Sequence, residues 1–225
     1  MIAASENGHA EVVKFLLEKG TDVNIKNTDG LTALMVTSQK GHMDVIKLLL
    51  EKGADVNVED TNGVTSLMVT SQDGHTEIVK LLLAKGADVK AKSRDGVTAL
   101  MMASEKGHTE IVKLLLEKRA DVNAKSRDDV TALMVTSQNG HTEIVKLLLD
   151  KGADVNVKRS SDGGTALMMA SENGHTEIVK LLLNKGANLN AKTTIDDIDY
   201  TALGIAKLKG KKDIIEMLEK AGAKE

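Results

Sequence analysis

Six histidines are the residues of this sequence whose chemistry and spacing first suggest a functional site. Each follows a glycine, and in four copies this pair opens the identical run GHTEIVKLLL. Imidazole is a common general base and a common metal ligand, so a row of histidines could bind metal ions or transfer protons. The six are His9, His42, His75, His108, His141 and His175.

The surroundings of these histidines favour a structural role. Metal ligands must converge to about 2 Å from one ion, whereas packed helices lie about 8–10 Å apart, so successive copies should stand too far apart to share an ion. A catalytic histidine needs a nucleophile and an orienting partner, and a catalytic site would not be repeated in every copy. We therefore expect the histidines to fix the turns between helices, and we expect no catalytic residue, metal or cofactor.

Other reactive groups recur in the same way. A serine returns at one helix position in five copies, which predicts packing rather than a nucleophile. Most acidic residues fall in ADVN loops and at helix ends, and the glycines form no phosphate-binding loop. The serines are Ser38, Ser71, Ser104, Ser137 and Ser171.

Composition excludes several classes of function. The formal net charge is −3 and lysines alternate with glutamates, so no basic footprint for nucleic acid is present. No apolar run approaches the ~18 residues of a membrane span, and no signal peptide is visible. We therefore expect a cytoplasmic protein with no membrane or nucleic-acid partner, although secretion by another route stays open. The absence of cysteine excludes disulfides and thiolate metal sites.

All these residues recur at a regular spacing along the chain. The glycine before the histidine recurs every 33 residues from Gly8 to Gly140, which indicates one supersecondary unit stacked on copies of itself. Within the copy 93–125, Thr98 is a good cap for a first helix and Gly107 suits its left-handed end. We expect Thr109 to cap a second helix and Lys118 to lie in its last turn.

The run DGVTALMMASEKGHTEIVKLLLEKRADVN resembles the ankyrin repeat, with T-A-L-M in place of the family's T-P-L-H. The resemblance covers essentially the whole chain. It implies an all-α solenoid of stacked helix-turn-helix units, with projecting β-hairpin-like turns and a concave face that binds proteins. The copies form a single domain over 1–225, with a partial first copy at 1–26, full copies at 27–59, 60–92, 93–125, 126–158 and 159–192, and a capping copy at 193–225.

The two ends of the chain differ. Lys207 and Glu219 replace a serine and a leucine of the other copies, and polar residues at packing positions mark a capping repeat. Met1 falls where Leu34 lies in the next copy, so the first helix lacks its turn and its threonine. We expect that upstream repeats were removed or that a partner covers this end.

Two positions depart from glycine within the stack. Arg119 and Asp129 stand where other copies have glycines at the end of the second helix and in the turn. If both backbones stay left-handed, the arginine costs roughly 1–2 kcal/mol. Residues 117–131 are therefore the expected weak segment.

Positions that vary among the copies are the candidates for recognition, because the invariant ones build the scaffold. They lie in the turns, just after the turn glycine, and at the ends of the first helices. Tyr200 belongs to an acidic insertion, TTIDDIDY, in the last copy. The candidates for binding a partner protein or peptide are Leu31, Gln39, Lys40, Val64, Gln72, Asp73, Arg94, Val97, Glu105, Lys106, Arg127, Val130, Gln138, Asn139 and Tyr200.

Three other interpretations fit the same sequence. The varying residues could be solvent-exposed positions under no selection. The chain could be a structural spacer that associates end to end through its uncapped N-terminal face. It could also be the targeting domain of a larger enzyme whose catalytic part lies elsewhere.

Overall fold

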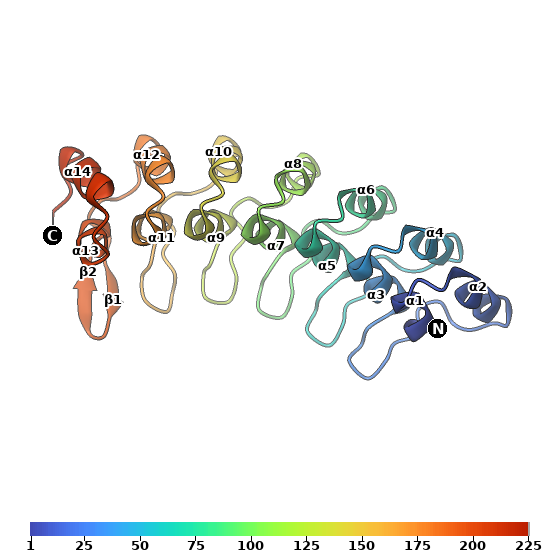
Figure 1. Ribbon diagram of the computed structural model, residues 1–225. Coiled ribbons are helices and arrows are strands. Elements are labelled where there is room, and N and C mark those ends of the chain that lie inside the picture. The colour runs from blue at the N-terminus through green and yellow to red at the C-terminus, as the bar shows by residue number, and fades with distance from the viewer. Residues whose placement is uncertain (225) are drawn as a thin grey trace. The chain divides into compact units, whose positions relative to one another are not determined.

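The computed structural model describes residues 1–224, apart from the side chain of Ile195. The chain divides into two compact units, Met1–Ala120 and Asp121–Glu225, and each is described by itself. Within each unit the helices come in antiparallel pairs joined by long projecting loops (Figure 1). The expectation of a single domain over 1–225 stays a prediction.

The named elements of unit 1 are all helices, beside one isolated antiparallel bridge of Glu59 with Thr65, and unit 2 adds one small hairpin. The elements of unit 1 are α1 (Ile2–Glu6), α2 (Ala10–Glu18), α3 (Ala33–Lys40), α4 (Met43–Glu51), α5 (Ser66–Asp73), α6 (Thr76–Ala84), α7 (Ala99–Lys106) and α8 (Thr109–Glu117). The elements of unit 2 are α9 (Ala132–Asn139), α10 (Thr142–Asp150), α11 (Ala166–Asn173), α12 (Thr176–Asn184), β1 (Thr193–Ile195), β2 (Ile198–Tyr200), α13 (Ala202–Leu208) and α14 (Lys212–Lys220). The expected all-α solenoid of stacked helix pairs is confirmed.

The first helix of each pair lies beside the projecting loops and is called the inner helix, and the second is called the outer helix (Figure 1). The inner helices begin and end as expected. In α7, the Thr98 hydroxyl accepts a hydrogen bond from the Met101 backbone N–H at 3.3 Å, and Gly107 has a φ of 79°. The threonine therefore satisfies one free donor of the first turn, and the glycine ends the helix at low cost.

The outer helices begin differently from our expectation. Thr109 does not cap α8, because it is the helix's first residue and His108 occupies the N-cap without a side-chain hydrogen bond. Lys118 lies one residue beyond α8 and not in its last turn. The histidine side chain is unavailable for capping because it contacts the preceding repeat, as described below. Glu110 does lie in the first turn, where a negative charge is favourable.

The core of each unit consists of aliphatic side chains buried between successive helix pairs. In unit 1, α3 packs on α5 and α5 on α7, and in unit 2 α9 packs on α11. The outer helix α4, for example, contributes Val45, Ile46 and Leu49, each at most 1% exposed, to this core. Each helix has nine residues or fewer, so packing rather than intrinsic propensity must stabilise it.

The projecting loops, called finger turns, span 27–32, 60–65 and 93–98 in unit 1 and 126–131, 159–165 and 193–201 in unit 2. Each later finger turn of a unit forms a backbone hydrogen bond with the one before it. The Thr61 N–H donates to the Asp29 carbonyl at 3.0 Å, and the Thr194 N–H donates to the Asp162 carbonyl at 2.9 Å. The last finger turn contains the antiparallel hairpin of β1 and β2, whose tip places Asp196 and Asp197 in left-handed backbone.

The recurring serines are fully buried, as the packing interpretation predicts. Four of these hydroxyls, and also that of Ser5 in the first copy, find no hydrogen-bond partner among the described residues: Ser38, Ser71, Ser104, Ser137 and Ser5. Ser171 differs, because its hydroxyl donates to the Leu167 carbonyl at 2.7 Å. A buried hydroxyl without a partner costs free energy, so this column of the core is not optimal.

The two expected left-handed positions are confirmed. Arg119 has a φ of 65° and Asp129 a φ of 54°. At the corresponding Gly53 and Gly86, an added Cβ would meet nothing within 4 Å. The cost of Arg119 is therefore backbone strain alone and not a steric clash with a neighbour.

We predict that Arg119→Gly raises the free energy of unfolding by about 1 kcal/mol, since glycine adopts this backbone without a Cβ penalty. The reverse change, Gly86→Arg, should lower it by a similar amount. Urea unfolding followed by circular dichroism measures both. No change from either substitution would contradict the strain argument.

We also predict that Ser71→Ala raises the free energy of unfolding by about 1 kcal/mol, because it removes a buried, unsatisfied hydroxyl. The matched control is Ser171→Ala, which removes a hydroxyl that is hydrogen-bonded and should give a clearly smaller gain or a loss. Equal effects at the two sites would show that the missing hydrogen bond is not what matters.

Candidate recognition surface

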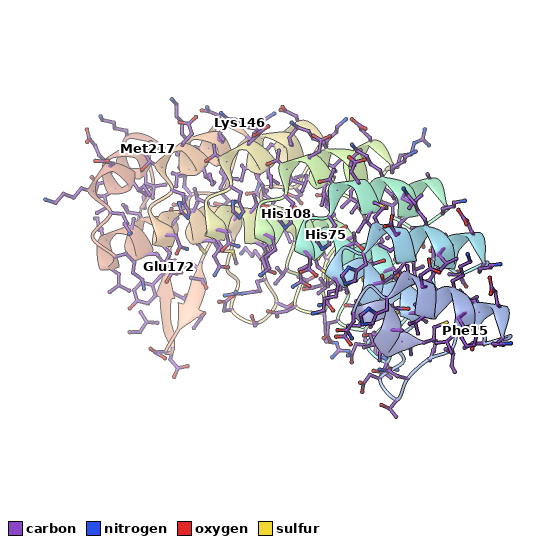
Figure 2. The ribbon with its side chains drawn as sticks, turned by 45° about the vertical axis from the view of Figure 1, so that its right-hand side comes forward. Phe15, His75, His108, Lys146, Glu172 and Met217 are labelled. Carbon is purple, nitrogen blue, oxygen red and sulfur yellow. The ribbon has the colours of Figure 1, made fainter. Side chains whose placement is uncertain are left out.

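The histidines bridge successive repeats. The His75 Nε2 lies 2.9 Å from the Gln39 carbonyl oxygen, and the His108 Nε2 lies 2.9 Å from the Gln72 carbonyl oxygen (both histidines are labelled in Figure 2). A carbonyl only accepts, so Nε2 must carry the proton. His42 and His175 make the same contact with Glu6 and Gln138. The bond therefore ties a histidine to the inner helix of the preceding copy, rather than fixing only its own turn.

The glycine before each histidine makes this approach possible. A Cβ added at Gly74 would lie 2.6 Å from the His108 Cε1, closer than any real contact, and its φ of 81° favours glycine as well. The imidazole nitrogen and the glycine are thus both used by the scaffold. This arrangement supports the structural interpretation of the histidines and leaves the surface beside the finger turns as the candidate site.

An apolar row follows the finger turns. Leu31, Val64 and Val97 in unit 1 are half-buried, so each presents part of its side chain to solvent. In unit 2, Val130 and Tyr200 are also half-buried. An added Cβ at Gly204 would lie 3.5 Å from the Tyr200 ring, which places the ring beside the start of α13.

Hydrogen bonds hold the turns that carry this row. The Asn27 Oδ1 accepts from the Leu31 N–H at 2.9 Å, and the Asp60 Oδ1 accepts from the Val64 N–H at 2.8 Å. In the third turn the Ser93 hydroxyl accepts from the Val97 N–H at 3.1 Å. Each apolar residue therefore stands on a turn closed by a side chain of the same turn.

Polar candidates border the apolar row. At the ends of the inner helices all are exposed except Gln72, which is half-buried; they are Gln39, Lys40, Gln72, Asp73, Glu105, Lys106, Gln138 and Asn139. Arg94 and Arg127 are exposed on the finger turns. In each unit the structure thus brings turn residues and helix-end residues together beside the same inner helices.

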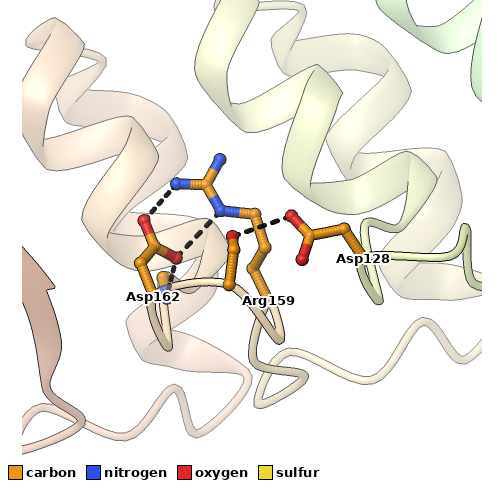
Figure 3. A network of polar contacts seen from close by, with 5 residues as sticks. Asp128, Arg159 and Asp162 are labelled. Atoms are coloured by element: carbon orange, nitrogen blue, oxygen red, sulfur yellow. Dashed lines mark hydrogen bonds and ion pairs between the residues drawn. The ribbon is translucent and has the colours of Figure 1, made fainter.

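Sequence reasoning missed one finger turn of this surface. The turn 159–165 holds an ion pair of Arg159 with Asp162, in which the arginine Nε donates to the Asp162 Oδ1 at 2.9 Å (Figure 3). The Ser161 hydroxyl donates to the Asp128 Oδ2 at 2.8 Å, and the Ser160 hydroxyl donates to the Asp129 Oδ2 at 2.6 Å. Its copy is one residue longer than the others, so it could not be compared with them position by position.

Hydrogen bonds at the finger turns 126–131 and 159–165 lower the pKa of two carboxyl groups. The hydrogen bond from Arg159 holds the pKa of the Asp162 carboxyl below its usual value, with a further backbone hydrogen bond from Gly164. The Ser160 hydroxyl, followed by Lys125, lowers the pKa of Asp129. The lowered pKa values keep both carboxyl groups ionised near neutral pH, where Asp162 is paired with Arg159 and Asp129 accepts from Ser160.

Met102 and Val69 also border the apolar row, although neither is among the binding candidates predicted from the sequence. Both are half-buried on inner helices, one turn before the variable helix ends, and both continue the apolar row onto the helices. The sequence signal was present, because these positions fall four residues before Lys106 and Asp73 on the same helix face.

One depression on this surface is small. It lies beside Arg159, Asp162 and Met169 and has a volume of about 70 Å³, below the roughly 300–1,000 Å³ of small-molecule sites. In the described residues no group of three or more histidine or acidic side chains could hold a metal ion. None of the helices described here is long and apolar enough to cross a bilayer.

A family model described as ankyrin repeats (3 copies) matches residues 1–93, 90–159 and 157–224. A comparison with curated proteins found no significant match. The family match therefore covers nearly the whole sequence.

We predict that Arg159→Gln raises the pKa of Asp162 toward its ordinary value of 3.8, because the guanidinium that stabilises the carboxylate is lost. A carboxyl with a lowered folded pKa adds stability above its unfolded pKa, and this stability is lost as pH falls through the folded pKa. The substitution should therefore flatten the dependence of stability on pH below about 4.

Carbon-detected NMR titration of the Asp162 carboxyl measures this pKa directly. Arg127→Gln is the matched control and should leave the Asp162 titration unchanged. An unaltered Asp162 pKa in Arg159→Gln would show that the ion pair does not form in solution.

Proposed function

Because the chain belongs to the ankyrin-repeat family, we propose that it binds a partner protein or peptide on the surface formed by its finger turns and inner helices. Repeats of this family generally serve as protein–protein interaction modules and are typically non-catalytic. The proposed role here is accordingly non-enzymatic. The surface considered is that of unit 1, with an equivalent surface in unit 2.

One observation supports the proposal most strongly. Many residues that repeat from copy to copy are buried or bonded to a neighbouring repeat, as Leu49 and His75 are. Residues that vary, such as Lys40, Asp73 and Lys106, are exposed beside the finger turns. A stack held by its invariant residues leaves the variable ones free to differ in what they recognise.

The chemistry of the surface suits a protein partner. In unit 1, Leu31, Val64 and Val97 offer an apolar row that a partner could bury. The charge of the polar border changes along the unit, from positive at Lys40 to negative at Asp73. This change favours one orientation of a bound chain. Apolar residues rimmed by polar ones are a common pattern at protein interfaces.

The surface is also ordered before binding. The Asn27 and Asp60 side chains close their turns, and neighbouring finger turns are joined by backbone hydrogen bonds. Little loop ordering would therefore oppose association. A partner would displace water from the apolar row and form hydrogen bonds along the helix ends.

We predict that Leu31→Ser, Val64→Ser and Val97→Ser, combined in one variant, abolish capture of a partner from a lysate of the source cells, because the apolar contact is lost. The matched control combines Leu48→Ser and Leu81→Ser, two half-buried positions on outer helices. Circular dichroism must show that both variants stay helical.

A second variant tests the same surface without changing half-buried residues, in case the serine variant is unstable. Lys40→Glu with Lys106→Glu alters only exposed side chains at the inner-helix ends, and should weaken capture several-fold. Its control, Lys47→Glu with Lys52→Glu, makes the same charge change on and just after α4. Equal capture by both charge variants and by the wild type would refute the proposed surface.

A further inference from the structure

Helix α13 of unit 2 carries an exposed leucine where the preceding copies have a polar residue. Leu208, at the end of α13, is 62% exposed. The corresponding residues are all glutamate or glutamine: Glu6, Gln39, Gln72, Glu105, Gln138 and Glu172. These residues are exposed or half-buried although another repeat follows each of them. The exposure of Leu208 therefore comes from its place on the inner helix, and a following repeat would not cover it.

An apolar depression lies beside this leucine. Ile205 precedes Leu208 by three residues, so both lie on one face of α13. Ile205 and Met169 line the depression of about 70 Å³ described above, and they are only 4% and 8% exposed. They therefore form its floor, and the space suits the end of one apolar side chain of a bound segment.

The hairpin of β1 and β2 extends the apolar surface. Tyr200 pairs with Thr193, which lines the same depression, so these two side chains share one face of the hairpin. Ile198 is 54% exposed and lies two residues before Tyr200, so it projects from that face as well. Strand side chains stand perpendicular to a sheet, so pairing at the hairpin edge would not cover them. We call this set the anchor surface: Met169, Ile198, Tyr200, Ile205 and Leu208.

The tip of the hairpin places negative charge beside the anchor surface. Asp196 and Asp197 are exposed there, and neither side chain has a hydrogen bond or an ion pair with another residue that the structure describes. Asp199 differs, because its Oδ1 accepts from the Thr194 hydroxyl at 2.9 Å. The tip thus offers two carboxylates to a cationic group of a partner.

The lysines at the end of α13 are already paired. The Lys209 Nζ lies 3.1 Å from the Glu172 Oε1, and the Lys207 Nζ lies 3.3 Å from the Glu219 Oε1 (Glu172 is labelled in Figure 2). Lys211 belongs to the start of the outer helix α14. An acidic segment on the anchor surface would have to compete with these ion pairs, whereas a basic segment meets the carboxylates of the hairpin tip directly.

We propose that the anchor surface binds an extended segment of a partner protein that carries a large apolar side chain and, about three residues away, a lysine or arginine. The apolar side chain enters the depression and covers Leu208, and the basic side chain pairs with Asp196 or Asp197. Tyr200 follows Asp197 by three residues, about 10 Å along a strand, which an extended segment spans with about three residues. This inference rests on the proposed function, because it names the partner chemistry for the surface of unit 2.

Other occupants match the anchor surface less well. An anionic bilayer would cover Ile198 and Leu208 but would be repelled by the carboxylates of the hairpin tip. Two copies of the chain that met through this surface would bring the same carboxylates together, and juxtaposed like charges are costly at an interface. A basic segment satisfies both the apolar and the acidic parts.

A phage-displayed library of random peptides tests the proposal without a known partner. The wild-type chain serves as the bait, and the enriched peptides are then synthesised and their Kd values measured by fluorescence anisotropy. The enriched peptides should share a large apolar residue with a lysine or arginine about three positions away.

Serine substitutions locate the apolar contact. Ile198→Ser with Leu208→Ser should weaken binding of the enriched peptides by about tenfold, because contact with a few central side chains dominates such interfaces. Both residues are exposed, so circular dichroism and urea midpoints should match the wild type. The matched control is Val12→Ser with Ile25→Ser, which changes two exposed apolar residues of unit 1 and should leave the Kd unchanged.

Amide substitutions locate the charged contact. Asp196→Asn with Asp197→Asn should weaken binding several-fold and reduce its dependence on salt concentration, because salt screens attraction between exposed charges. The matched control is Asp44→Asn with Asp213→Asn, which makes the same charge change in the first turns of α4 and α14. This control should bind the peptides as the wild type does.

Three results would overturn the proposal. One is a selection that enriches no peptide, or enriches peptides without a basic residue. Another is binding that Ile198→Ser with Leu208→Ser leaves unchanged. The third is a wild-type dimer in sedimentation velocity that the same two substitutions abolish, which would make the occupant a second copy.

The unit 1 variant separates this inference from the proposed function. Enriched peptides that bind the Ile198→Ser, Leu208→Ser variant but not the combined Leu31→Ser, Val64→Ser, Val97→Ser variant would support the surface of unit 1 and reject the anchor surface. Peptides lost only from the Ile198→Ser, Leu208→Ser variant would support the anchor surface, even if the unit 1 substitutions left partner capture unchanged.

Discussion

Burial of one helix pair against the next is the contact on which the structure depends. The helices have nine residues or fewer and would be marginal in isolation. Val45, Ile46 and Leu49 become fully buried only because a neighbouring pair covers them. A repeat array therefore draws its stability from nearest neighbours, and each repeat must present the same residues at the same positions. That requirement explains why the sequence repeats so closely.

Directional contacts fix how the pairs stack. A histidine reaches a carbonyl of the preceding inner helix, an asparagine side chain accepts from the next loop, and consecutive finger turns share a backbone hydrogen bond. Apolar burial alone would tolerate sliding of one pair on another, whereas these bonds are satisfied in one register. The histidines are thereby committed to the scaffold, and any recognition must use the residues that stacking leaves exposed.

Much of this could be predicted from the sequence, because the determining interactions are local. Thr98 and Gly107 bound α7 as their capping chemistry predicts, and Arg119 and Asp129 keep the backbone of the glycines they replace. Contacts between repeats could not be predicted in the same way. Thr109 looked like a cap, but His108 holds that place while its ring reaches a carbonyl 36 residues away. The network of Arg159 could not be predicted, because its turn has an extra residue and no counterpart in the other copies. The variable residues lie on the surface as expected, yet their role in binding stays a prediction.

The central claim is that repeated residues hold the stack and variable residues bind the partner. Hydrogen exchange of the chain, alone and with its captured partner, tests this claim most directly. The account predicts that the partner slows exchange at the finger turns and inner-helix ends, at 27–32, 60–65 and 93–98 in unit 1, while the outer helices α4 and α6 are unchanged. Slowed exchange confined to the outer helices would contradict it.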